Sequence, residues 1–347
     1  MGGLCFLGGS SKGRPKGWRA QSHGDRLRGG RGGPGCMDSD LAQVKAPRRK
    51  RRKLPRSFKE LTPTQAFSPR AYFRQMVWKA LLTPRGGQRK TPAFPRLGEK
   101  QVAITFIGHA SFLIQFADLN VLIDPNFANW LFFMKRQKHA GLKLKDLPQA
   151  DLVLLTHAHF DHFHKRTLRR LSSPRMAIVP WGVGDLADGL GFDRVLELEW
   201  WEMFSRGDLR VTLTPCKHWG ARVLRDHHRG YGGFLLEYHG RRIYHAGDSA
   251  YFDGFKEIGK RCTPEIALLP IGAYEPESFR SVHMGPDDAV KAFRELQAQW
   301  IVPMHYGTFR LSFEDMDEPL LRFRGLIEKA NLGRHLRVLE EGVPEVF

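Results

Sequence analysis

The chain has 347 residues, of which 41% are hydrophobic, enough for a sizeable core in one or two domains. No run of 18 or more apolar residues occurs, so the sequence predicts no transmembrane helix. The formal net charge is +19, and its distribution is uneven: residues 1–100 contain 24 Lys and Arg against 5 Asp and Glu, whereas residues 101–347 contain 31 of each kind. A strongly basic character is therefore excluded for the larger, C-terminal part.

Residues 1–60 are rich in Gly, Arg, Lys and Pro and lack apolar periodicity. This composition predicts a disordered basic arm. Such an arm can bind nucleic acid, bind anionic lipid or stay solvated. The opening residues 1–7 have no basic n-region and no clear cleavage site, which argues against a secretory signal.

Cysteine usage favours a reducing compartment, because the four cysteines lack the spacing of a disulfide framework. We therefore expect a cytoplasmic protein. The cysteines are Cys5, Cys36, Cys216 and Cys262.

Ser68 and Pro69 resemble an N-cap followed by proline at the first helical position. They predict a short basic amphipathic helix, and residues 61–100 are expected to form this helix and a linker that pack on the core. The alternative is a peripheral contact of residues 45–82 with an anionic membrane surface.

From Val102 the pattern changes to short apolar runs, which predict an antiparallel meander over 102–107, 111–116 and 121–123. Strands and helices then alternate, so we expect residues 101–347 to form one α/β domain in which two sheets lie between helices, an αββα sandwich. The further predicted strands are 152–155, 176–179, 194–198, 209–213, 232–238, 241–244, 266–269 and 301–302, and the predicted helices are 165–171, 185–190 and 287–296.

The stretch with the most chemistry is 157–162, His-Ala-His-Phe-Asp-His, which directly follows the predicted strand 152–155. Imidazole and carboxylate are ligands that zinc takes in proteins. Three imidazoles and a carboxylate at a strand end are hard to explain as packing. The sequence therefore predicts a loop that holds two metal ions side by side.

The pattern His-x-His-x-Asp-His after a short apolar strand resembles the signature of the metallo-β-lactamase superfamily of binuclear metallohydrolases, and the resemblance implies the same αββα fold. It also implies that His157 and His159 serve one metal, and that Asp161 and His162 serve the other. Three later residues match the remaining ligands by their local context. They are His218 for the first metal, Asp248 as the bridging carboxylate and His305 for the second metal.

Further motifs narrow the resemblance to the branch that contains N-acylphosphatidylethanolamine-hydrolysing phospholipase D. They are 268–276 (Leu-Leu-Pro-Ile-Gly-Ala-Tyr-Glu-Pro), His283, 289–290 and 305–309 (His-Tyr-Gly-Thr-Phe). The similarity runs from about Phe67 to Leu321. In that branch a histidine matching His283 lies by the metals and helps with the substrate. The insert 225–231 departs from the branch and bears on the shape of the cleft.

The implied chemistry is hydrolysis. Two Zn²⁺ ions per chain, ~3.5–4 Å apart, can share one hydroxide, because zinc lowers the pKa of bound water to roughly 7. We expect Asp248 and Asp161 to be the catalytic carboxylates, with Asp248 aiming the metal-bridging hydroxide at phosphorus. His283 is expected to protonate the leaving group. Iron or manganese also suits these ligand types.

These expectations describe a phosphodiesterase for a small or phospholipid-like diester. The same ligands also fit hydrolysis of lactone or amide bonds. A third hypothesis is a nucleic-acid-processing metallohydrolase that uses the basic arm. Against it, the cations of residues 1–60 are not interleaved with stacking aromatics, and residues 101–347 carry no net charge.

Two other features stay open at this level. His109 either supports a ligand from behind or is a turn residue. The aromatic stretch 130–134, in a long connection after Asp124, either lines a substrate cleft or covers the core.

Overall fold

A computed structural model of the chain describes residues 77–171, 176–223 and 226–347. The predicted basic arm, residues 1–60, and the predicted helix start at Ser68 lie outside the described residues.

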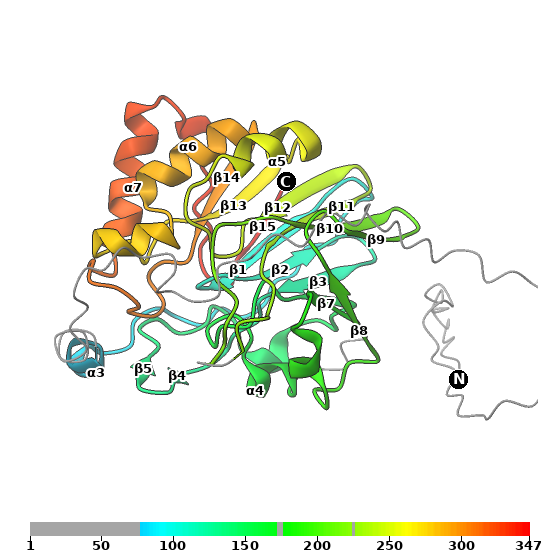
Figure 1. The fold of residues 1–347 in the computed structure, drawn as a ribbon, viewed down its shortest axis with the longest axis horizontal. Helices are drawn as coiled ribbons and strands as arrows, with labels where there is room; N and C mark the ends of the chain where they lie inside the picture. Colours follow the sequence, from blue (N-terminus) through cyan, green and yellow to red (C-terminus); the bar gives the residue numbers. More distant parts are fainter. Residues whose placement is uncertain (1–76, 172–175, 224–225) are drawn as a thin grey trace, which may run out of the picture. The chain divides into compact units, whose positions relative to one another are not determined.

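Two β-sheets form the centre of the described fold (Figure 1). In spatial order the strands of the larger sheet are β15 (Pro344–Val346), β1 (Ala103–Gly108), β2 (Ser111–Gln115), β3 (Asn120–Ile123), β6 (Leu152–Leu154), β7 (Met176–Pro180) and β8 (Arg194–Leu198). Those of the smaller sheet are β14 (Trp300–Met304), β13 (Ile266–Pro270), β12 (Arg241–His245), β11 (Gly233–Tyr238), β10 (Leu209–Thr214) and β9 (Met203–Arg206). A separate pair consists of β4 (Trp130–Leu131) and β5 (Met134–Lys135).

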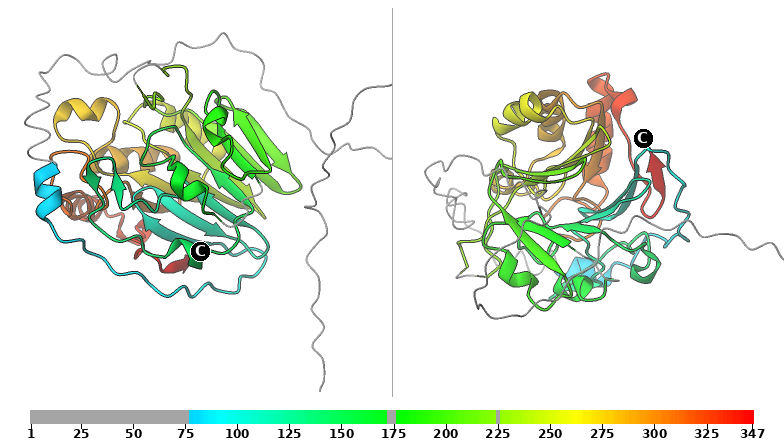
Figure 2. Two further views of the ribbon diagram at one scale, coloured as in Figure 1. Left: turned by 90° about the horizontal axis from the view of Figure 1, so that it is seen from below. Right: turned by 90° about the vertical axis from the view of Figure 1, so that its right-hand side faces the viewer.

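Helices cover the outer faces of both sheets, and Figure 2 shows the sheets face to face between them. The smaller sheet is covered by α5 (Gly254–Cys262), α6 (Pro286–Leu296) and α7 (Glu318–Lys329). The larger sheet is covered by α4 (Lys165–Leu168) and the 3₁₀ helix η3 (Gly184–Ala187). The remaining helices are α3 (Lys79–Leu82) and the 3₁₀ turns η2 (Leu144–Asp146), η4 (Glu277–Ser281) and η5 (Gly333–His335). The predicted αββα fold class is confirmed.

The larger sheet is buried on both faces, so alternate residues of one strand enter different cores. In β6, Leu152 and Leu154 pack in the core between the sheets, whereas Val153 packs with Phe163 and Leu168 on the helix side. This is why these strands read as continuous apolar runs. Among the helices of the described residues, none is both long enough and apolar enough to cross a membrane.

The predicted strands are all present, with ends displaced by at most two residues. The hairpin between β11 and β12 turns at His239 and Gly240, as predicted; both have positive φ, 48° and 78°, as a two-residue hairpin loop requires. The helix predicted over 185–190 was wrong in type and length, because it is the 3₁₀ helix η3 and the chain turns away at Gly189, where φ is +67°. Strands β9 and β15 and helices α5 and α7 were not predicted.

The helix predicted to begin near Ser68 is described only at its end, as α3. This end lies against β5: Lys135 Nζ donates to the carbonyl oxygen of Thr83 at 2.7 Å, and Gln137 Nε2 donates to that of Ala80 at 3.2 Å. Val77 and Ala80 are buried there.

Candidate metal centre

Strand directions bring the polar loops to one edge of each sheet. Strands β1 and β3 point the same way because both run antiparallel to β2, and β6 is parallel to β3. In the smaller sheet β10 and β12 share a direction because both run against β11, and β13 and β14 are parallel to β12. The residues that follow these strand ends are His109 after β1, Asp124 after β3, 157–162 after β6, His218 after β10, Asp248 after β12 and His305 after β14.

The centre of the resulting cluster is Asp248, whose Oδ2 lies within 4 Å of a nitrogen of five histidines. The distances are 3.1 Å to His305 Nε2, 3.2 Å to His162 Nε2, and 3.9 Å to His157 Nε2, His218 Nε2 and His283 Nδ1. The structure thus brings together all seven residues predicted as ligands.

These residues form three overlapping groups, in each of which the candidate ligand atoms lie within 4.8 Å of one another. The groups are His157, His159, His218 with Asp248; His109, Asp161, His162 with His305; and Asp248, His283 with His305. Asp248 is common to the first group and to the group with His283 and His305, and its Oδ2 also lies 3.2 Å from His162 Nε2 of the remaining group.

The cluster fits metal ions on its own chemistry. Ligand nitrogens held 2.0–2.1 Å from a tetrahedral zinc lie roughly 3.3 Å from one another, and His159 Nδ1 lies 2.9 Å from His157 Nε2 and 3.2 Å from His218 Nε2. Buried polar atoms normally have hydrogen-bond partners. Six atoms here have none among the described residues: His159 Nε2, His162 Nε2, Asp248 Oδ1, His283 Nδ1, and both ring nitrogens of His305.

The charge states of the two carboxylates and of the first histidine group also suit a cation. Burial raises the pKa of both Asp161 and Asp248, but the neighbouring histidines, His162 foremost among them, together outweigh this and hold each pKa well below its usual range, so both carboxylates are ionised. The imidazoles of the first group stay neutral, because burial lowers the pKa well below its ordinary value for His157, to about 3 for His159 and to about 4 for His218.

Asp124 supports the cluster from behind. Its Oδ2 accepts hydrogen bonds from His162 Nδ1 at 2.7 Å and from the Thr156 hydroxyl at 2.6 Å, and its Oδ1 accepts the Thr156 N–H at 2.8 Å. Because that hydroxyl proton goes to Asp124, the Thr156 oxygen accepts from His157 Nδ1 at 2.9 Å. Both imidazoles are thereby oriented with Nε2 toward the site.

Neither Asp124 nor Thr156 was predicted from the sequence as part of the site. The signal that could have identified them is their position at strand ends. Each follows a buried strand, β3 and β6, and parallel neighbours end at the same edge of a sheet.

His109 fills both roles that the sequence left open. It lies in the turn between β1 and β2 with φ of +62°, and its Nε2 donates to Asp161 Oδ2 at 2.9 Å. Its backbone N–H donates to Thr308 Oγ1, and its carbonyl oxygen accepts the His305 N–H, each at 2.7 Å. His109 therefore connects the loop 157–162, through Asp161, with the loop after β14.

The loops that carry His218 and Asp248 are fixed by a hydrogen bond and by close backbone packing. His218 Nδ1 donates to the carbonyl oxygen of Val282 at 2.9 Å, which orients its ring. Gly247, before Asp248, has φ of +61°, and a Cβ there would lie 2.7 Å from the carbonyl oxygen of Gly232. Only glycine fits this turn.

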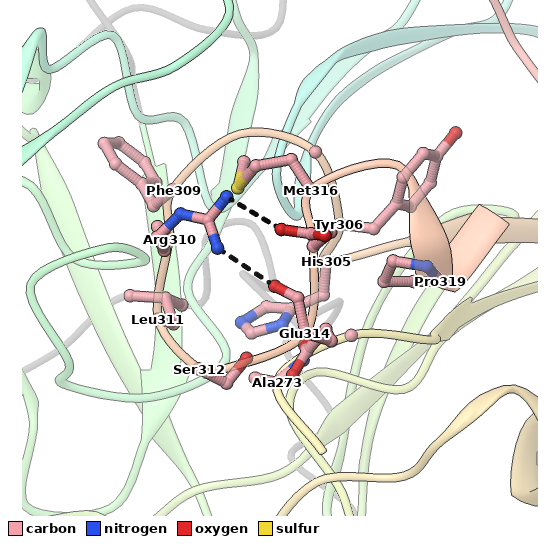
Figure 3. Close-up of a pocket in the computed structure, with 13 residues that line it drawn as sticks. Ala273, His305, Tyr306, Phe309, Arg310, Leu311, Ser312, Glu314, Met316 and Pro319 are labelled. Atoms are coloured by element: carbon pink, nitrogen blue, oxygen red, sulfur yellow. Dashed lines mark hydrogen bonds and ion pairs between the residues drawn. The ribbon is translucent and has the colours of Figure 1, made fainter. Parts of the chain in front are cut away.

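The loop after His305 folds back on itself around the side chain of Arg310 (Figure 3). Arg310 is buried, donates to the Glu314 carbonyl oxygen at 3.2 Å and lies 3.7 Å from the Asp315 carboxylate. The Glu314 carboxylate in turn accepts the N–H of Ala273 at 2.6 Å. These bonds fix the His305 loop to the loop that follows β13.

Some members of the cluster reach solvent. The side chains of Asp161 and His283 are 14% and 15% exposed, whereas those of Asp248 and His305 are at most 2% exposed. Trp219 lies beside His159 with ring centroids 4.3 Å apart. A substrate would therefore approach past His283 and Asp161.

Part of the insert that departs from the branch pattern is held against η3. Arg229 is buried and pairs with Asp185 at 2.5 Å and Asp226 at 2.6 Å. His228 is exposed on this loop, away from the cluster.

The fold and the site together define a two-sheet protein with a histidine and carboxylate metal centre at the strand ends. A model of the beta-lactamase superfamily domain matches residues 119–306. The chain belongs to the metallo-β-lactamase superfamily, a superfamily of metal-dependent hydrolases.

Individual relatives are consistent with this superfamily membership. The mitochondrial N-acyl-phosphatidylethanolamine-hydrolyzing phospholipase D of Saccharomyces cerevisiae is 33% identical over 262 residues, 70% of this chain and 55% of the relative. The N-acyl-phosphatidylethanolamine-hydrolyzing phospholipase D 1 of Caenorhabditis elegans is 33% identical over 61% of this chain and 65% of the relative. The chain thus matches less than two thirds of the length of either. Igni18, a metallo hydrolase from Ignicoccus hospitalis, has a similar structure: TM-score 0.57, 26% identity, 72% of this chain and 99% of that one.

Proposed function

We propose that this chain is a binuclear zinc-dependent phosphodiesterase of the N-acylphosphatidylethanolamine phospholipase D type. The observation that carries the proposal is the position of Asp248 Oδ2, which lies 3.9 Å from His157 Nε2 and His218 Nε2 of one proposed ligand set and 3.1–3.2 Å from His305 Nε2 and His162 Nε2 of the other. The two relatives named for this activity support the substrate class.

The proposed ligands are those predicted from the sequence, with Asp248 common to both ions. When bound, two zinc ions would supply Lewis acidity and a water of lowered pKa. The ligands are His157, His159 and His218 for one ion, Asp161, His162 and His305 for the other, and Asp248 for both.

The chain's own residues would orient this centre and bind the substrate. Asp161 stays aligned because it accepts the His109 Nε2–H, and Asp248 lies in a turn that Gly247 alone permits. The two carboxylates would position the attacking water opposite the leaving oxygen of a diester.

His283 is proposed to assist the leaving group. Its side chain, like that of Asp161, is partly exposed, and its ring lies 5.1 Å from that of His218. Burial lowers the pKa of His283 well below its ordinary value, so the ring is neutral near pH 7 and carries one N–H. A neutral imidazole can still donate that hydrogen to a developing alkoxide.

A cytoplasmic setting belongs to the same proposal. The described cysteines, Cys216 and Cys262, are buried free thiols, as expected in a reducing compartment.

The test combines metal analysis with a substrate panel. Purified, zinc-repleted protein should contain two ions per chain and should hydrolyse N-acylphosphatidylethanolamine to phosphatidic acid, and also a generic phosphodiester, but not a lactone, an amide or single-stranded RNA. Asp161→Ala should abolish turnover, whereas His228→Ala, a histidine outside the cluster, should not.

One ion or none after repletion would contradict the binuclear site. Lactone or amide turnover without diester turnover would favour the carbon-substrate hydrolase, and RNA cleavage the nucleic-acid-processing alternative.

A further inference from the structure

Two neighbouring elements, α3 and the β4–β5 pair (Figure 1), carry large exposed apolar side chains. Six of the eleven such side chains among the described residues lie there. We call this set the apolar edge: Trp78, Leu81 and Leu82 around α3, and Trp130, Phe132 and Phe133 of the β4–β5 hairpin. Contiguous exposed apolar surface marks an interaction site.

The tip of the β4–β5 hairpin is unusual for a turn facing water. Phe132 and Phe133 are its two loop residues, since Leu131 pairs with Met134. Phe132 has φ of +55°, at a position where hairpins normally place glycine, and its side chain is 69% exposed. Neither backbone preference nor burial explains a bulky aromatic residue here.

The surroundings of the edge are cationic. Residues 61–98 contain no Asp or Glu. Lys135 donates only to carbonyl oxygens of the α3 segment, and Arg85 donates to Asn129 and to the Arg136 carbonyl oxygen. In the described part of the chain neither cation makes an ion pair, whereas Lys79 pairs with Asp315 at 2.6 Å. An apolar tip beside unpaired cations complements an anionic lipid surface.

The apolar edge contacts the loop 157–162, which carries four of the proposed metal ligands. Phe132 packs edge-on against Phe160, with ring centroids 4.5 Å apart, and Phe160 lies between His159 and Asp161. Of residues 45–82, the alternative membrane contact drawn from the sequence, the structure describes only 77–82; the β4–β5 hairpin was not part of that alternative.

We infer that the apolar edge docks on an anionic lipid bilayer, with Phe132 and Phe133 entering the interface and Arg85 and Lys135 at the level of the headgroups. The docking itself is independent of the proposed activity. That docking would help turnover of a lipid substrate rests on the proposed function. It would bring the partly exposed side of the metal centre close to the membrane surface.

The test is sedimentation of the full chain with phosphatidylcholine vesicles that do or do not contain phosphatidylglycerol, in the absence of substrate. The test variant is Phe132→Asn with Phe133→Ser. Asparagine suits the positive φ at 132, so the variant should melt no earlier than wild type. The control is Leu321→Ser on α7, where the leucine is 68% exposed and far along the chain from the edge.

The double variant should bind anionic vesicles roughly 100-fold more weakly, because each of the two phenylalanines contributes about a factor of ten when its ring leaves water. This loss should persist at high salt, since only the charge contribution is screened. Leu321→Ser should bind as wild type does.

Wild-type binding by the double variant would overturn the inference. So would a change from dimer to monomer in the double variant with unchanged vesicle binding, which would make the edge a contact between copies of the chain. Vesicle binding without hydrolysis of any diester would contradict the proposed function and leave the docking surface intact.

Discussion

Replacing Asp124 by Asn should weaken metal binding without unfolding the protein. Asp124 has φ of +44°, a region that asparagine tolerates, so the change isolates the carboxylate charge. Asp124 accepts three hydrogen bonds: the N–H and the hydroxyl of Thr156 and the Nδ1–H of His162. An amide offers one acceptor oxygen and one donor nitrogen in place of the two acceptor oxygens.

Either orientation of the amide creates a conflict. With its nitrogen toward the Thr156 N–H, two donors face each other. With its nitrogen toward His162, the proton of His162 must move to Nε2, the atom that faces Asp248. The lost bonding is worth about 1–3 kcal/mol, which corresponds to roughly 10–100-fold weaker metal binding, as for other carboxylates that orient a histidine ligand.

The assay is competition for zinc between the metal-free protein and a chromophoric chelator, with melting of the metal-free protein as the check on folding. The control is Asp118→Asn, because Asp118 is 55% exposed and bonds to the Tyr238 hydroxyl instead of a cluster residue. Equal zinc affinity in Asp124→Asn and Asp118→Asn would refute the orienting role of Asp124.

Three further outcomes are expected. His283→Ala should retain both ions and slow hydrolysis of an unactivated diester by ~10²–10⁴, with a smaller loss on a nitrophenyl diester; equal losses on both substrates would rule out leaving-group assistance. Gly247→Ala should destabilise the fold by at least ~1 kcal/mol in denaturant melts and reduce the metal content, because of its positive φ and the Gly232 carbonyl oxygen at 2.7 Å; a normal metal content would show that the turn adapts. Deleting residues 1–60 should leave turnover of a soluble diester nearly unchanged, since a segment rich in Gly, Arg, Lys and Pro without apolar periodicity buries little apolar area, and should make vesicle binding weaker and less salt-sensitive; lost turnover would place the arm in the catalytic unit.

The sequence by itself determined the strands and the residue types of the centre. Strand 152–155 was visible because a strand buried on both faces is a continuous apolar run, a property of consecutive residues. The loop 157–162 was visible because four metal-capable side chains follow one another within it. Such patterns of consecutive residues can be recognised without knowledge of the fold.

Only the tertiary structure decided which side chains support the ligands. Asp124 reaches His162 across 38 positions, and His109 reaches Asp161 across 52 and Thr308 across 199. These contacts depend on strand order and direction, which bring distant strand ends to one edge, and no pattern in consecutive residues encodes them.

The tertiary structure also decided which side chains of the stretch 130–134 are buried. From the sequence its aromatic residues could equally cover the core or line a cleft. In the fold, Leu131 and Met134 join a small apolar cluster with Phe309, whereas Phe132 and Phe133 extend outward. Adjacent side chains of a strand point to opposite sides, so Leu131 of β4 is buried whereas Trp130 is exposed, and Phe132 and Phe133 form the turn that follows. Which side is buried depends on Phe309, a residue far along the chain that only the fold brings beside Leu131.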